Sequence, residues 1–110
     1  MAFTGNFMCT SFKLQLMSGV HAISASASSP VRAADTFKIA LYTSSATLDA
    51  STTVYSATNE TSGTGYTAGG NTLASGATSS SGTTAFADFA DSSWTTASFT
   101  ARGALIYNST

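Results

Sequence analysis

Large apolar side chains recur at helical spacing near the start of the chain. They lie four residues apart and so share one helix face: Phe12, Leu16 and Val20. Thr10 or Ser11 can cap the beginning of this helix, and Gly19 suits its exit. The pattern predicts one short helix over residues 10–19, the only clear helical signal in the sequence.

From residue 36 the apolar period shortens to two, which indicates a half-buried strand. One side of this strand carries Phe37, Ile39 and Leu41. The other side carries Lys38, Ala40 and Tyr42. Further short runs predict strands at residues 52–56, 72–77, 83–89, 94–101 and 103–108, with polar turns at 78–82 and 91–93. Short strands with turns every ~8–12 residues favour an all-β fold, an antiparallel β-sandwich (jelly-roll-like) with one short N-terminal helix.

Glycine occupies four of the nine positions from 62 to 70. This density predicts a loop with positive-φ turns, and we expect Tyr66 to anchor it. A phosphate-cradling loop is a poor alternative, because the spacing differs, no lysine follows and no helix signal opens after it.

Small residues and the only proline lie in a Ser/Ala-rich connector, residues 24–34. We expect a flexible connector or an extended arm there. The chain is therefore divided into an N-terminal arm with its helix and connector, 1–34, and a β-sandwich domain, 35–110. The last apolar run, 103–108, is expected to lie at a sheet edge that another chain covers.

The chain is rich in hydroxyl groups and poor in ions. Thirty-eight of its 110 residues are Ser or Thr, nine are charged, and the formal net charge is −1. The four basic residues are dispersed, which argues against nucleic acid and anionic membrane as partners. No stretch approaches the ~18 apolar residues of a membrane span. Because charge normally keeps proteins apart in solution, this composition favours a member of an assembly.

Candidate catalytic or metal-binding residues are few. His21 lacks a partner at a suggestive spacing, and Glu60 lacks the second carboxylate that a glycosidase needs. Cys9 cannot form an internal disulfide; we expect a small buried residue, with an intersubunit bridge or a reactive thiol as alternatives. Calcium binding by three aspartates is a weaker explanation than turn capping: Asp49, Asp88 and Asp91. We therefore predict no catalytic site, no metal and no cofactor.

Four aromatic side chains could form a sugar-stacking platform, but a charge-poor sandwich rich in alanine needs large rings to fill its core. The core interpretation is favoured for Phe86, Phe89, Trp94 and Phe99.

The whole chain resembles a family of small virion structural proteins of tailed bacteriophages. The resemblance depends on the order of five stretches: residues 1–5, Ser11-Phe12-Lys13 with Gly19 and His21, residues 36–43, residues 62–67 with Gly69 and Gly70, and residues 101–108. It implies a capsid- or tail-associated protein in many copies, without an enzymatic role. The chain departs from the family in a longer connector before Asp35. Relatives also continue past Asn108 with further strands, which a neighbouring subunit could supply here.

The leading expectation is a capsid decoration (cement) protein, made in the host cytoplasm and located in the virion. It would bind other virion proteins, chiefly the major capsid protein, and itself as a homo-oligomer. The expected partner-binding residues are Phe3, Phe7, Phe12, Leu16, Val20 and Tyr107. The alternative is a tail- or fibre-associated module that binds a host glycan or receptor through Tyr66, Trp94 or Tyr107.

Overall fold

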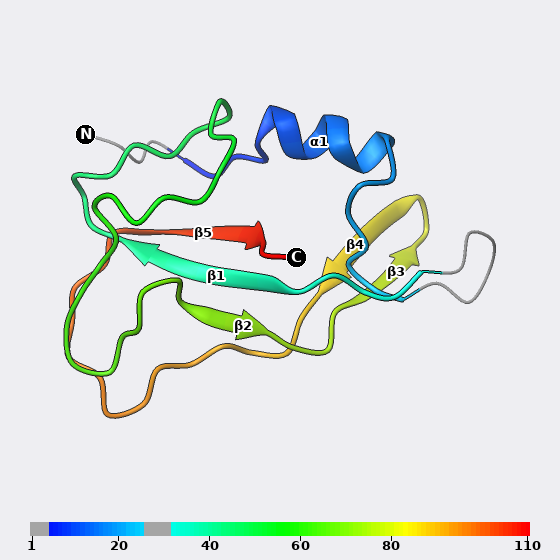
Figure 1. The fold of residues 1–110 in the computed structure, drawn as a ribbon. Coiled ribbons are helices and arrows are strands. Elements are labelled where there is room, and N and C mark those ends of the chain that lie inside the picture. Colours follow the sequence, from blue (N-terminus) through cyan, green and yellow to red (C-terminus); the bar gives the residue numbers. More distant parts are fainter. Residues whose placement is uncertain (1–4, 26–31) are drawn as a thin grey trace.

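The computed structural model describes residues 5–25 and 32–110, in which one helix precedes five strands (Figure 1). The elements are α1 (Thr10–Met17), β1 (Phe37–Tyr42), β2 (Asn71–Leu73), β3 (Ala77–Ser81), β4 (Thr84–Asp88) and β5 (Gly103–Asn108). They form a three-stranded sheet in the order β2-β1-β5 and a two-stranded sheet of β3 and β4, both antiparallel. The expected all-β character with one short helix is confirmed. Phe3 and most of the connector, residues 26–31, lie outside the described residues.

The central strand β1 pairs along its whole length with β5, so that Ile39 lies opposite Ile106. On its other side β1 pairs with the shorter β2, where Ile39 lies opposite Asn71. The strands predicted at residues 37–42 and 103–108 are thus confirmed, and β5 lies at an edge of its sheet, as expected.

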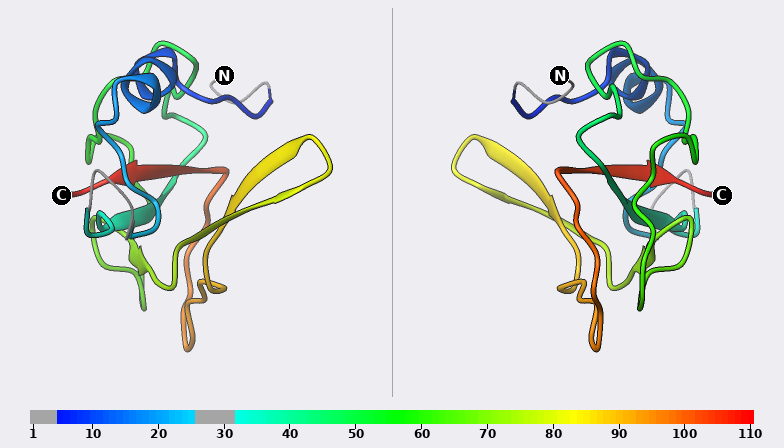
Figure 2. Two further views of the ribbon diagram at one scale, coloured as in Figure 1. Left: turned by 90° about the vertical axis from the view of Figure 1, so that its right-hand side faces the viewer. Right: turned by 90° about the vertical axis from the view of Figure 1, so that its left-hand side faces the viewer.

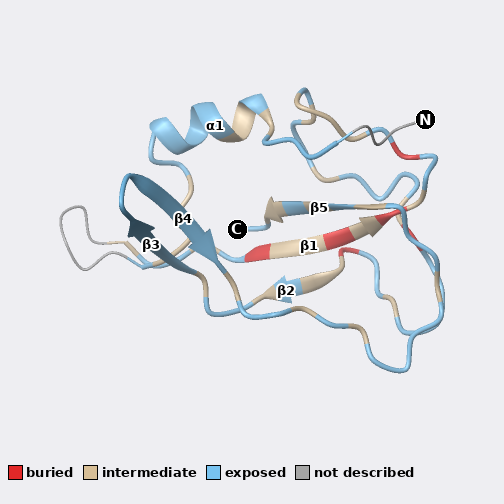
Figure 3. Cartoon of the chain, turned by 180° about the vertical axis from the view of Figure 1, so that it is seen from behind, coloured by how far each residue is buried: buried red, intermediate tan, exposed pale blue. Residues whose placement is uncertain are grey.

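The buried residues of β1 lie mainly on the side that carries Ala40 and Tyr42. Ala40 and Tyr42 are buried together with Ala46, whereas Ile39 and Leu41 are only partly buried (Figure 3). The reason is the segment after β1, which folds back over the Ala40–Tyr42 side. Partly buried residues that pack against this core are Leu48, Tyr55, Leu105 and Tyr107. Phe37 is buried on its own and contacts Phe89, with ring centroids 5.8 Å apart.

Two of the predicted strands are wrong. Residues 52–56 form no strand, although Tyr55 packs in the core as an alternating pattern would require. Residues 94–101 are irregular apart from one bridge, between Ser98 and Thr64. Both segments use their aromatic side chains for packing. Neither segment belongs to one of the two sheets.

The boundaries around the hairpin are also shifted. Residues 78–82 were expected to form a polar turn, but residues 78–81 belong to β3, and the turn follows at Gly82 and Thr83. The expected strand at 72–77 is divided between β2 and the first residue of β3. Residues 91–93, also expected to turn, adopt no regular turn. Serine is common in turns because its hydroxyl can bond the backbone, yet here an exposed hairpin accommodates it equally well.

Helix α1 begins and ends differently from the cap prediction. Its N-cap is Cys9, without a side-chain cap bond, and the hydroxyl of Ser11 donates instead to the carbonyl of Thr52. At the C-terminus Gly19 has φ of 73°, as an exit glycine should. The Gly19 and Val20 amides donate to the carbonyls of Leu16 and Gln15, which is a Schellman motif. The helix ends at Met17, so Val20 lies beyond it.

The β3–β4 hairpin projects from the rest of the molecule (Figure 2). All ten of its strand residues are exposed, and it makes no contact with the other strands. Its base is attached through Phe89 and through a bond between the hydroxyls of Ser24 and Thr78. Among the described helices, none is long and apolar enough to cross a membrane.

Candidate interaction site

Exposed apolar side chains concentrate in the N-terminal part of the chain. Of the nine large apolar residues that are exposed in the described part of the chain, six lie between Phe7 and Val20: Phe7, Met8, Leu14, Leu16, Met17 and Val20. Helix α1 buries none of its residues. Single apolar residues on a surface are normal, whereas several close together in the chain make this segment a candidate interaction surface. We call residues 7–20 the apolar arm.

The apolar arm is held in place mainly by polar bonds to the loop after β1. The amide of Thr10 donates to the carbonyl of Ala50 at 2.8 Å, and the thiol of Cys9 lies 3.6 Å from the carbonyl of Asp49. An isolated helix of eight residues is only marginally stable in water, so these anchors hold α1 where it is.

A second set of bonds joins the described residues at the two ends of the connector to the apolar arm. Arg32 donates to the carbonyls of Gly19 and Val20 at 2.6 and 2.7 Å and forms an ion pair with Asp35 at 3.1 Å. The amide of Ala22 donates to the same Asp35 carboxylate at 2.9 Å. This bond, helped by Asn108 and Arg32, lowers the pKa of Asp35 against the opposing effect of burial. The connector ends are therefore bonded to the arm.

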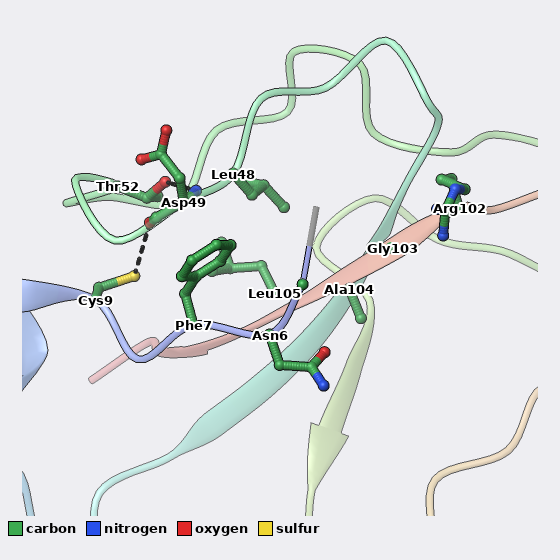
Figure 4. Close-up of a pocket in the computed structure, with 11 residues that line it drawn as sticks. Asn6, Phe7, Cys9, Leu48, Asp49, Thr52, Arg102, Gly103, Ala104 and Leu105 are labelled. Atoms are coloured by element: carbon green, nitrogen blue, oxygen red, sulfur yellow. Dashed lines mark hydrogen bonds between the residues drawn. The ribbon is translucent and has the colours of Figure 1, made fainter. Parts of the chain in front are cut away.

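A chain of hollows separates the apolar arm from β5. Figure 4 shows the first of them, with a volume of about 500 Å³, where Asn6 and Phe7 form one wall and residues 103–105 the other. Two further hollows, of about 450 and 380 Å³, adjoin it along β5. Cys9 and Leu105 line all three hollows, so they form one slot, which we call the β5 slot. Cys9 is therefore half-buried beside this slot and not a fully buried core residue.

The structure distributes the expected partner-binding residues over different surroundings. Phe7, Leu16 and Val20 are exposed, with fractions of 54, 38 and 48%. Phe12 is half-buried, with its ring centroid 4.7 Å from that of His21. Tyr107 faces the core instead, stacks on Tyr55 at 4.6 Å and donates its hydroxyl to the carbonyl of Gly69. The exposed members thus lie on the arm, while Tyr107 is engaged internally.

His21 is bonded in a way that defines its tautomer. Its Nε2 donates to Gln15 at 2.9 Å, and its Nδ1 accepts from the side-chain amide of Asn108 at 2.8 Å. The same Asn108 amide donates to Asp35. His21 therefore holds no direct bond to an acid. This chain of bonds joins the helix exit, the connector and the end of β5.

A polar cluster that the sequence did not reveal surrounds Glu60. Its carboxylate accepts hydrogen bonds from the hydroxyls of Tyr55 and Tyr66 and from the amide of Gly69. Tyr66 in turn accepts from the amide of Leu41 at 2.9 Å, which confirms it as the anchor of the glycine-rich loop. The isolated position of Glu60 in the sequence excluded a carboxylate pair, but only the fold shows that tyrosines surround it.

This cluster shifts the acidity of the tyrosines. Bonding to Glu60 raises the pKa of Tyr55, with burial adding to it, and burial followed by bonding to Glu60 raises that of Tyr66. Burial raises the pKa of Tyr42 to about 12 and also raises that of Tyr107. All four phenol groups therefore stay protonated at neutral pH, and those of Tyr55 and Tyr66 remain donors to Glu60.

The aspartates considered for calcium act locally. Asp49 accepts from the amide and hydroxyl of Ser51 at 2.9 and 2.6 Å, and Asp88 accepts from the amide of Phe89 at 2.9 Å. Within residues 5–25 and 32–110, no group of three potential ligands is arranged for a metal ion. The turn-cap explanation fits Asp49 directly.

Of the four rings considered for sugar stacking, Trp94 and Phe99 contact each other and Tyr66, whereas Phe89 contacts Phe37. Tyr66 lies 6.1 Å from Trp94 and 5.3 Å from Phe99, measured between ring centroids. The indole nitrogen of Trp94 is buried without a hydrogen-bond partner in the described residues. Trp94 and Phe99 are half-buried. Phe86, by contrast, is 48% exposed on β4 and does not belong to a core.

Comparisons with family models, with curated proteins and with solved structures find no match for this chain.

Proposed function

We propose that this chain is a structural protein of a tailed-bacteriophage virion, specifically a capsid decoration (cement) protein. The observation that carries the proposal is the apolar arm, which the chain leaves exposed beside an open slot. Only four apolar residues among those described are fully buried. A protein with so small a core gains stability when a neighbour covers its arm.

The proposed mechanism is attachment through many weak contacts. Repeated copies on a shell need no strong individual site, because multivalency multiplies modest affinities. The major capsid protein and further copies of this chain would be the partners, and the virion its location. Strands that a neighbour supplies beside β5 would complete the proposed β-sandwich. No catalytic role belongs to this proposal.

The test is co-sedimentation of the purified protein with empty heads of the phage that encodes it. We expect the double variant Leu14→Glu/Met17→Glu to lose at least tenfold in affinity, because charges on the arm oppose burial. Leu14 and Met17 are 60 and 82% exposed, so the fold should tolerate both changes. Phe86→Glu is the matched control. Wild-type protein that stays in the supernatant, or a double variant that binds normally, would refute the proposal.

A host-glycan module remains the second hypothesis. It predicts sugar binding that is lost in Trp94→Ala while the fold is retained. Trp94 packs against Tyr66 and Phe99, so part of its ring is engaged within the chain, and this contact favours the decoration role.

A further inference from the structure

The outer edge of β5 carries unpaired backbone groups. The amide of Ser109 donates to the carbonyl of Thr36, and the amide of Leu41 points away from β5 to Tyr66. Because hydrogen-bonding positions alternate along an antiparallel pair, residues 103, 105 and 107 bond to β1. The backbone groups of Ala104, Ile106 and Asn108 therefore point away from the sheet. Among the described residues, none bonds to these groups.

This free edge faces the β5 slot. The hollows follow β5 from Arg102 to Ser109, and the segment from Gly5 to Phe12 forms their opposite wall. Six residues of strand span about 20 Å and need a neighbour roughly 5 Å away. The slot thus follows β5 on the side where a further strand would pair, and at Phe37 and Ile39 it extends over one face of the sheet.

The lining of the slot defines the chemistry of its occupant. The hollow beside Ala104 and Ile106 contains no charged residue, and its walls are apolar: Phe7, Met8, Phe12, Ile23, Phe37 and Phe89 among them. The charged residues Asp49 and Arg102 line only the hollow at the beginning of β5. A charged occupant would lose its hydration without gaining a partner in the middle of the slot. An uncharged, partly apolar occupant fits.

We propose that the β5 slot receives an extended, uncharged segment of a neighbouring polypeptide other than this chain, which is apolar at alternate positions and adds to β5 as a further strand. Its backbone would bond to Ala104, Ile106 and Asn108, and its apolar side chains would fill the space between Phe12 and Phe89. Backbone groups that recur at every second residue match a strand better than any small molecule. The inference deepens the proposed function, since both require a neighbouring polypeptide, but its test needs no particle.

The test uses a capped seven-residue peptide of alternating threonine and valine, titrated into the full chain. Amide hydrogen exchange, measured by NMR, should slow at least tenfold at Ala104, Ile106 and Asn108 when the peptide is in millimolar excess. The amides of Leu105 and Tyr107 should change little, because they already bond to β1. A peptide with glutamate in place of valine should have no effect. Unchanged exchange at the three free amides, or an equal response to both peptides, overturns the proposal.

Variants then locate the peptide on the slot. Ile106 is 55% exposed, so Ile106→Lys should fold and should weaken peptide binding at least tenfold. Phe7→Ser on the opposite wall gives a second, independent variant that should weaken it as well. Phe86→Lys, an exposed strand residue elsewhere, is the matched control and should bind normally. Equal binding by all three variants contradicts the proposal.

Two outcomes distinguish this inference from a homodimer and from the proposed decoration function. If the free protein dimerises and Ile106→Lys abolishes the dimer, a second copy occupies the edge and the proposed foreign segment is wrong. If the peptide binds but the protein does not co-sediment with phage heads, the binding of a strand in the slot is confirmed and the decoration function is refuted.

Discussion

At the scale of single residues, Gly70 is the described glycine that leaves least room for a side chain. It has φ of 78°, and a Cβ there would lie 1.8 Å from the carbonyl oxygen of Ile39. The glycine-rich loop can therefore approach β1 only because this residue lacks a side chain. The turn prediction from glycine density was correct, but the close approach to β1 depends on tertiary structure.

We expect Gly70→Ala to destabilise the protein by about 3 kcal/mol, since both the clash and the positive φ must be relieved. Gly82→Ala is the matched control: Gly82 also has positive φ, but nothing lies within 4 Å of its Cβ position. The control should cost about 1 kcal/mol. Urea denaturation measures both values. Equal losses would show that the backbone contact is unimportant.

The Glu60 carboxylate accepts three hydrogen bonds, from Tyr55, Tyr66 and Gly69. Glu60→Gln should destabilise the protein by roughly 1–3 kcal/mol at neutral pH, because two phenol groups lose a charged acceptor. In the variant, spectrophotometric titration should find the pKa values of Tyr55 and Tyr66 lower than in the wild type. Asp91→Asn, at an exposed carboxylate, should leave the titration unchanged.

The same tyrosines predict an alkaline limit to stability. Their pKa values are raised in the folded state, so the folded state holds its phenol protons more tightly than the unfolded state does. This stability is complete below pH ~10, the ordinary tyrosine pKa, and is lost as pH rises further. Glu60→Gln should show a weaker decline above pH ~10 than the wild type. An identical decline would contradict the assignment.

At the scale of elements, the sequence pattern predicted where several individual strands lie. Strands β1, β4 and β5 combine alternation with adjacent turn residues, and all three form where the sequence indicates. The period of two in β1 does not tell which side forms the core, and Ala40 and Tyr42 are buried although one is small and the other is amphipathic. Their burial comes from a later loop, which adds Ala46 and Leu48. Residues 94–101 have strand-like composition, but no strand lies beside them.

The two sheets should differ in local stability. Strand β1 has a neighbour on each side, whereas β3 and β4 pair only with each other and are wholly exposed. Isolated two-stranded hairpins are marginal in water. We expect hairpin amides such as those of Ser79 and Phe86 to exchange at least a hundredfold faster than those of β1. Hydrogen exchange by NMR tests this, and uniform protection across both sheets would refute it.

At the scale of the whole molecule, the exposed arm and the open sheet edge lie beside one another. The sequence indicated each of them separately: the apolar residues near the N-terminus as partner contacts, and residues 103–108 as an edge. Their meeting across the β5 slot depends on the anchoring of Thr10 to Ala50, which no periodicity could reveal. One neighbour could therefore cover both features at once.

The β3–β4 hairpin has a use of its own. Its tip at Gly82 meets no other part of the described molecule, and the hairpin projects outward (Figure 2). Loop tips of this kind tolerate inserted sequence. If many copies coat a phage head, an epitope grafted at Gly82 would be repeated across the particle at regular intervals. The head would thereby become a dense antigen array for immunisation.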